Sequence, residues 1–322
     1  MKKMILFSQA PADIQYVLSL YHNHKETHDI LIIVVNVKNN FKFFHSLNLI
    51  AKIEFVPLIG QKNILKFLKY SILLKIKYKS LFSKFNNAQV YFFSNNYDYV
   101  TAYFINKLQI KNNIFFVDIY NIDGKEIISI QNNIKVKIMK YLFGIDIKFF
   151  SIAGANAYQY LFDKNKINTI SIEVNPKNLH GYRYKINSNH KKRVLIFESN
   201  GVLDKSFANY QDDLTKIILK VNDKYDIYIK PHPRLGYSQF LLNYKLNIID
   251  SYIPSELLRI SDFDIVLGID SASIAAGQHL NKLSLIDLFE FSDETRKNYL
   301  KNYLNKLSKN KLIYLDSIDG IE

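Results

Sequence analysis

A histidine held between two prolines is the residue whose surroundings point most clearly to chemistry. An apolar run that predicts a buried strand ends at Lys230, and His232 follows between Pro231 and Pro233. The prolines fix the backbone and exclude a helix, so the imidazole is held rigidly at the carboxyl end of the strand. There it can protonate or hydrogen-bond a departing phosphate, while Lys230 and Arg234 supply positive charge. The alternative is a tight turn with an exposed histidine.

An acidic residue in the first half of the chain is a second candidate. Asp123 follows the apolar run IFFVDIY and directly precedes Gly124. An acid and a glycine just beyond a strand commonly form a turn, and this interpretation stays open. The same position can present the carboxylate as a general base, with the glycine letting an acceptor approach closely.

A serine-rich turn follows another apolar strand. Gly268 ends the run FDIVLG, Ser271 and Ser273 come next, and the run 273–280 predicts a helix. Serine hydroxyls and free backbone amides at a helix start suit a nucleotide phosphate. Ordinary capping of the helix by Asp270 or Ser271 explains the same residues.

Two further loops contain weaker candidates. Glu256 falls in the first turn of a short predicted helix, where an acid either favours the helix dipole or binds ribose hydroxyls. The loop after the run RVLIF contains Glu198, Ser199, Asn200 and Gly201. An ordinary strand-to-helix loop is the alternative for these four residues.

The elements that must position these residues are short apolar runs that alternate with longer mixed segments. Runs of four to seven residues rich in Ile, Val and Phe are typical of buried parallel strands with helices between them. A polar break over 175–192 predicts a linker between two Rossmann-like domains, 1–178 and 179–322. In such α/β sheets, ligands bind at the carboxyl ends of the strands.

Composition restricts the class of protein. The 322 residues include no cysteine, which excludes disulfides and thiolate metal sites, and the formal charge of +14 favours anionic partners. The apolar run at the start is too short for a signal peptide, and lysines interrupt every candidate membrane span. We therefore expect a cytoplasmic protein, and contact with the inner face of the membrane depends on the lysine-rich segment described below.

The Asp-Gly turn, the Lys-Pro-His-Pro-Arg strand end and the serine turn about 40 residues later follow one another in a fixed order. This order of motifs resembles that of the bacterial sialyltransferases of glycosyltransferase families 52, 38 and 80. The strings IKPHPR and ILFSQAPADIQYVLSL resemble family 52, which includes lipooligosaccharide sialyltransferases. The resemblance spans nearly the whole chain, and the His-Pro segment is its most specific part.

The resemblance implies a fold of the GT-B type, with two Rossmann-like domains facing each other across a cleft. The implied reaction is an inverting transfer of sialic acid, or a related nonulosonic acid, from a CMP donor to a surface glycan such as lipooligosaccharide or capsule. Asp123 would be the general base in the first domain, and His232 would stabilise or protonate the CMP phosphate as it leaves. The first acid of the family's pair is Ile122 here, so that motif is half present.

The resemblance also implies a donor site in the second domain that needs no metal and no cofactor. Ser271 and Ser273 would hold the phosphate, and Glu256 would contact the ribose or the base. The full set of expected CMP-binding residues is Lys230, Pro233, Arg234, Glu256, Ser271, Ser273, Gly268, Ser199, Asn200 and Gly201.

Between Lys62 and Lys84 the sequence has seven lysines and no acid, and the pattern predicts a helix with a basic stripe. It either docks on an anionic membrane or is a core helix with a solvated lysine face. A last helix near the C-terminus is expected to pack back on the first domain. Two other functions stay open at this point: a GT-B transferase that uses CMP-Kdo or a UDP-hexose, and, ranked well below an enzyme, a basic nucleic-acid-binding protein.

Overall fold

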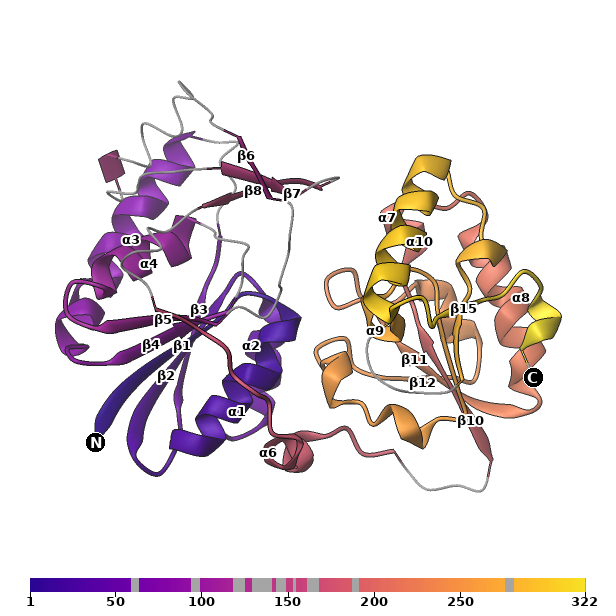
Figure 1. The fold of residues 1–322 in the computed structure, drawn as a ribbon, viewed down its shortest axis with the longest axis horizontal. Coiled ribbons are helices and arrows are strands. Elements are labelled where there is room, and N and C mark those ends of the chain that lie inside the picture. The colour runs from indigo at the N-terminus through magenta and orange to yellow at the C-terminus, as the bar shows by residue number, and fades with distance from the viewer. Residues whose placement is uncertain are drawn as a thin grey trace. The chain divides into compact units, whose positions relative to one another are not determined.

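The chain forms two compact units, residues 1–180 and 181–322, in the computed structural model shown in Figure 1. The structure describes residues 1–58, 64–93, 99–117, 125–128, 141–142, 149–152, 155–160, 168–186, 191–275 and 281–321. The predicted boundary, after residue 178, lies two residues before the boundary between these units.

The first domain is built on a six-stranded parallel sheet with the order β3-β2-β1-β4-β5-β9. Its strands are β1 (Lys2–Ser8), β2 (His28–Val35), β3 (Lys52–Val56), β4 (Gln89–Phe92), β5 (Asn113–Val117) and β9 (Asn168–Ile170). Its helices are α1 (Ile14–His24), α2 (Lys38–Ser46), α3 (Ile64–Lys84), α4 (Tyr99–Leu108) and α6 (Pro176–Leu179).

Helices cover both faces of this sheet, which is why its central strands read as uninterrupted apolar runs. Alternate residues of β1, Ile5 and Phe7, pack with Phe67 of α3 and Phe104 of α4 in one buried cluster. The intervening residues of β1 are also fully buried, and they face α1 and α2 because side chains alternate across a strand. Figure 1 shows the two helix pairs on opposite sides of the sheet.

The first domain ends in a segment that was predicted to be part of a linker. Instead, α6 packs on α1, Leu179 is buried, and the Asn178 side chain donates a 2.8 Å hydrogen bond to that of Asn23. Pro176 occupies the first turn of α6, where its missing N–H costs nothing, and the Asn175 side chain caps the helix. The start of the polar break therefore belongs to the first domain.

The second domain repeats the architecture with a six-stranded parallel sheet of order β12-β11-β10-β13-β14-β15. Its strands are β10 (Lys192–Phe197), β11 (Tyr225–Lys230), β12 (Asn247–Ile248), β13 (Ile265–Gly268), β14 (Lys282–Ser284) and β15 (Ile313–Tyr314). Its helices are α7 (Gly201–Asp204), α8 (Tyr210–Asn222), α9 (Ala272–Ala275) and α10 (Glu294–Ser308). The predicted α/β fold with two Rossmann-like domains is confirmed by the two sheets, and their arrangement across a cleft stays a prediction.

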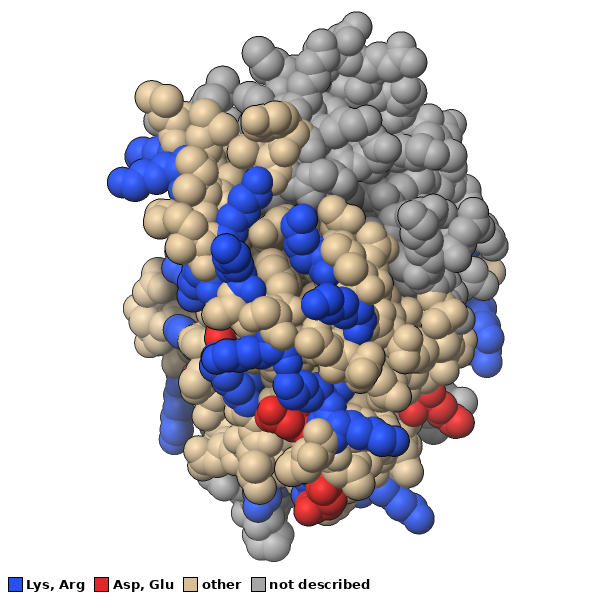
Figure 2. All heavy atoms as spheres, turned by 90° about the vertical axis from the view of Figure 1, so that its left-hand side faces the viewer, with Lys and Arg blue, Asp and Glu red and all other residues tan. Residues whose placement is uncertain are grey.

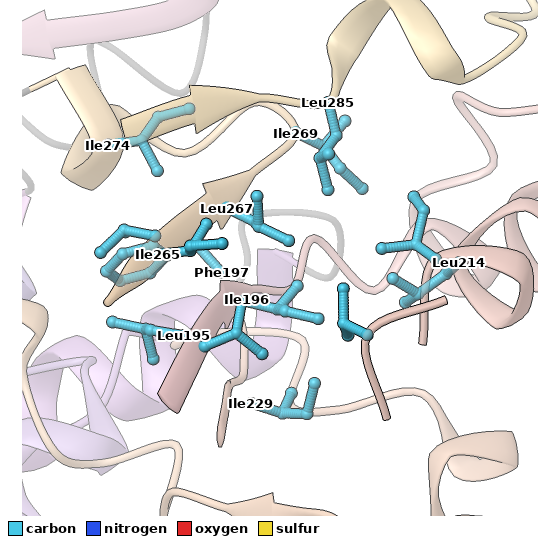
Figure 3. Close-up of a cluster of buried hydrophobic side chains, with 14 of the residues drawn as sticks. Leu195, Ile196, Phe197, Leu214, Ile229, Ile265, Leu267, Ile269, Ile274 and Leu285 are labelled. Carbon is cyan, nitrogen blue, oxygen red and sulfur yellow. The ribbon is translucent and has the colours of Figure 1, made fainter. Parts of the chain in front are cut away.

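An aliphatic core fixes the central strands of the second domain. Leu195, Ile196, Ile229 and Leu267 come from three adjacent strands, and Leu214 adds the inner face of α8 (Figure 3). Leu304 of α10 joins the same core, and α10 contacts α9. The expected contact of the last helix with the first domain stays a prediction.

A small antiparallel sheet adds three strands that the sequence pattern did not predict. They are β6 (Lys125–Ile128), β7 (Phe149–Ile152) and β8 (Ala155–Tyr160), in the order β6-β7-β8. Among the helices in the described ranges, none combines the length and apolar character needed to cross a membrane.

Candidate functional site

The candidate site lies at the carboxyl edge of the second sheet, around its topological switch point. The chain leaves β10 for β11 on one side and later returns to β13 on the other side. The loops after β10 and β13 therefore diverge, and this divergence creates the usual ligand position of open α/β sheets. The side chains of these two loops meet, because the Ser199 hydroxyl donates a 2.5 Å hydrogen bond to the Asp270 carboxylate.

His232 stands on the neighbouring strand end, in a turn that fixes one of its ring nitrogens. Nδ1 accepts hydrogen bonds from the backbone N–H groups of Arg234, at 3.2 Å, and Leu235, at 3.1 Å. The turn closes through Gly236, whose N–H donates to the His232 carbonyl at 2.9 Å and whose φ of 74° favours glycine. Since Nδ1 is an acceptor, the neutral ring carries its proton on Nε2 and is a donor there.

Burial favours the neutral form of this histidine. Burial lowers the pKa of His232 from its usual value, the Asp270 carboxylate opposes that shift, and the Arg234 cation reinforces it. Near neutral pH the ring is thus a hydrogen-bond donor through Nε2 without a full charge. Such a donor suits an oxygen on which negative charge develops during a reaction.

A buried carboxylate organises the loop after β10. The Oε1 atom of Glu198 accepts hydrogen bonds from the Ser238 hydroxyl at 2.6 Å, the Asn200 N–H at 2.9 Å and the Tyr210 hydroxyl at 3.0 Å. Burial raises the pKa of Glu198, and its hydrogen bonds with Ser238 and Tyr210 oppose the shift. The side-chain amide of Asn200 also donates to the Leu235 carbonyl at 2.9 Å, and this hydrogen bond connects the loop to the His232 turn.

Gly201 is required by packing beneath the same loop. A Cβ atom there would lie 2.3 Å from Cδ2 of Tyr210 and 2.6 Å from Cδ2 of Phe207. The Tyr210 hydroxyl also accepts the Ser199 N–H at 3.2 Å. The glycine lets the tyrosine reach both Glu198 and the backbone of the loop.

Lys230 is buried and faces the backbone. Its ammonium group donates to the Pro231 carbonyl at 2.9 Å and to the Ser251 carbonyl at 3.4 Å. Burial lowers its pKa to about 8, although the nearby carboxylates of Glu256 and Asp250 favour the charged form. Lys230 therefore holds the segment that leads into His232.

The predicted phosphate-binding serines lie on the far side of the switch point. The Ser271 hydroxyl accepts the Ser273 N–H at 3.3 Å, and the Ser273 hydroxyl donates to the Ser255 hydroxyl at 2.9 Å. Ser255 in turn donates to the carboxylate of exposed Glu256 at 3.1 Å. Gly268 precedes them, and a Cβ on it would lie 2.5 Å from the Ile274 side chain.

The structure thus gathers the predicted second-domain residues at the ends of β10, β11 and β13 and in the turn before β13. Pro233 is half-buried and Arg234 is exposed in the His232 turn. The helix expected over 273–280 is described as α9 to Ala275, and residues 276–280 lie outside the described residues. Asp123, with Ile122, also lies outside them, so its role as general base stays a prediction.

Several polar residues of this edge were weak candidates or were not considered as site residues. Asp270 was considered only as a helix cap and Glu198 only as a weak candidate, although Glu198 directly follows β10 and Asp270 lies two residues after β13, where site residues of α/β sheets are common. Tyr210 and Ser238 carry no signal in the sequence, because each reaches Glu198 from a distant segment. Within the described residues no three His, Asp or Glu side chains gather as metal ligands would, and the metal-free donor site stays a prediction.

Comparisons with known proteins return distant likenesses. No protein-family model matches the sequence, and no curated protein matches it. The chain is similar to the GT-B domain of a sialyltransferase from Photobacterium damselae, with 13% identity, coverage of 98% of this chain and 100% of that one, and a TM-score of 0.48. It is similar to a UDP-GlcNAc 2-epimerase from Methanocaldococcus jannaschii, with 15% identity, coverage of 99% and 90%, and a TM-score of 0.46. At these identities and TM-scores, neither likeness assigns the chain to a family.

Proposed function

We propose that this protein is a GT-B-type glycosyltransferase that transfers sialic acid, or a related nonulosonic acid, from a CMP donor to a glycan acceptor. The acceptor would be a bacterial surface glycan such as lipooligosaccharide or capsule. The reaction would invert the anomeric centre and need no metal. The observation that carries the proposal is the His232 turn, in which Nδ1 accepts two backbone N–H groups, so that the proton of the neutral ring is on Nε2.

A donor with a single phosphate is consistent with the character of this site. When the sugar leaves, negative charge develops on the phosphate oxygens of CMP, and a fixed neutral donor strengthens its hydrogen bond as that charge grows. Arg234 is exposed in the same turn, and the Ser271 and Ser273 hydroxyls lie at the end of β13. These groups would hold one phosphate with hydroxyls and one cation, without a divalent ion.

The remaining roles follow the sequence resemblance. Asp123 of the first domain would take the proton from the acceptor hydroxyl as it attacks the anomeric carbon. Glu256 would contact the ribose or the base, and Ser199, Asn200 and Gly201 would border the donor sugar. From its composition, the protein would work in the cytoplasm.

The test is release of CMP from CMP-Neu5Ac by the purified protein, with and without a galactose-terminated acceptor and EDTA. We expect release that the acceptor stimulates and that persists in EDTA. His232→Ala and Asp123→Asn should each nearly abolish it. His22→Ala removes an exposed histidine of α1 and serves as the matched control, which should keep full activity.

Calorimetric titration with CMP, UMP and UDP tests the nucleotide separately. The proposal expects CMP to bind more tightly than UMP or UDP. Preference for UDP would indicate a transferase that uses another activated sugar. Salt-sensitive oligonucleotide binding without CMP binding would indicate a nucleic-acid-binding protein. Undiminished turnover by both the His232 and the Asp123 variants would refute the assignment of the catalytic residues.

A further inference from the structure

The outer surface of α3 has a composition that packing within the first domain does not explain. The helix contains six lysines and no acid. Its buried residues, spaced at three and four, form the stripe that packs on the sheet: Phe67, Ser71, Leu74, Tyr78 and Leu81. A helix whose only task is to cover this sheet would be polar over the remaining surface.

Instead, a second apolar row lies on the solvent side of the helix. Leu65 is 79% exposed, Ile72 is 52% exposed and Ile76 is 68% exposed. At about 100° per residue the three side chains fall within roughly 40° of one another, directly opposite the buried stripe. The sequence is compatible with either membrane docking or a core helix with a solvated lysine face, and the solvent face is apolar along its middle.

Lysines flank this exposed apolar row on both sides. With the same helical spacing, Lys69 and Lys84 fall on one side of the row and Lys79 on the other. All three are exposed. Apolar side chains with lysines on either side are the arrangement of helices that lie in the surface of an anionic bilayer, where the lysine stems extend along the acyl region and their charges reach the headgroups.

The basic surface continues beyond the helix. A cavity of about 430 Å³ beside the C-terminal half of α3 is lined in part by Lys3, Lys52, Lys77 and Lys84. The lining also includes Asp29 and Glu54, and Glu54 pairs with Lys52 at 2.6 Å. Figure 2 shows this face of the first domain, where Lys and Arg side chains gather with few acids among them and apolar or neutral surface between them.

We propose that the α3 surface, defined as Leu65, Ile72 and Ile76 with the lysines beside them, binds the surface of an anionic phospholipid bilayer. The exposed leucine and isoleucines enter the boundary between headgroups and acyl chains, and the lysines pair with lipid phosphates. Aliphatic side chains in the middle of the patch favour lipid over nucleic acid, since they offer bases neither stacking nor hydrogen bonds. The absence of acids within α3 disfavours a second copy of the same surface as partner.

Co-sedimentation with vesicles tests the proposal without any sugar donor, so that its outcome is independent of the proposed enzymatic function. The vesicles are phosphatidylcholine alone, or phosphatidylcholine and phosphatidylglycerol in equal amounts. We expect binding to the anionic vesicles only, and loss of it at high salt. A lysine near an anionic surface raises the partition coefficient by a factor of about five. Lys69→Gln, Lys79→Gln and Lys84→Gln together should therefore weaken partitioning by about 100-fold.

Two matched controls make the same kinds of substitution elsewhere on the surface, and they test whether the effect depends on the position of the lysines and apolar side chains. Lys224→Gln, Lys245→Gln and Lys311→Gln remove the same charge from exposed positions of the second domain and should leave binding unchanged. Ile72→Ser with Ile76→Ser should weaken partitioning by about tenfold while the lysines remain. Leu219→Ser with Leu242→Ser, which are each 58% exposed, is the control for that pair.

The proposal is overturned if the protein binds both vesicle types equally, binds neither, or loses as much binding with the second-domain lysine control as with the α3 variant. Binding to oligonucleotides in place of vesicles would overturn it in favour of a nucleic-acid surface. A dimer that the Ile72 and Ile76 substitutions dissociate, with no vesicle binding, would overturn it in favour of self-association.

Discussion

Substitution of His232 by asparagine tests the acceptor role of Nδ1 and the donor role of Nε2 separately. The asparagine amide places an oxygen near the position of Nδ1, where it can still accept the N–H groups of Arg234 and Leu235, but it has no donor at the position of Nε2. Alanine removes both functions. We therefore expect His232→Asn to fold like the wild type and to lose the reaction, whereas His232→Ala loses both stability and activity.

The magnitudes follow from the two sets of contacts. Nδ1 accepts two hydrogen bonds, from Arg234 at 3.2 Å and Leu235 at 3.1 Å, in an exposed turn where water can replace the acceptor. Alanine should therefore lower the free energy of unfolding by about 1 kcal/mol, a shift in Tm of roughly 3 °C. Loss of one donor to a developing oxyanion should lower kcat by about 100- to 1,000-fold in both variants.

The assays are thermal unfolding and the steady-state rate of CMP release from CMP-Neu5Ac. A kcat of His232→Asn within a few fold of the wild-type value would refute the assignment of Nε2 as a donor to the leaving group. A Tm of His232→Asn as low as that of His232→Ala would refute the acceptor role of Nδ1. The roles of Nδ1 and Nε2 are therefore tested independently.

Two further predictions concern the groups around this turn. Lys230→Met should remove a pH dependence of stability: burial lowers the folded-state pKa from 10.5 to about 8, so wild-type stability decreases as pH falls from about 10.5 to about 8 and levels off below that. Between pH 7 and 9 the free energy of unfolding of the wild type should rise by about 1 kcal/mol relative to the variant in denaturant titrations, and parallel curves would contradict this. Gly201→Ala should cost about 1–3 kcal/mol, because its Cβ would overlap Tyr210 and Phe207. Gly181→Ala, with no atom within 4 Å of the added Cβ, should leave chemical unfolding unchanged, and equal effects of the two glycine substitutions would contradict the packing argument.

The strongest sequence signals were those that depend on neighbours along the chain. Uninterrupted apolar runs predicted the central strands, because strands buried on both faces need apolar residues at every position. The prolines beside His232 likewise act on their own backbone, and they follow the carboxyl end of β11 as expected. The short edge strands, such as β12 and β15 with two residues each, carry too little apolar sequence to predict.

Which side chains meet across the ends of different strands depends on the assembled fold. The Ser199 and Asp270 pair joins residues 71 positions apart, and the Ser238 and Glu198 pair joins residues 40 apart, so neither has a local signature. The direction in which His232 donates follows from a turn that closes only with Gly236 in place. The exposure of Ile72 and Ile76 was likewise undecided by the sequence, because a helix with two apolar faces shows the same periodicity whether one face or both are covered. Local sequence specifies the strands and the residue types at their ends, whereas the fold specifies their partners, because contacts between distant segments exist only once the sheets are assembled.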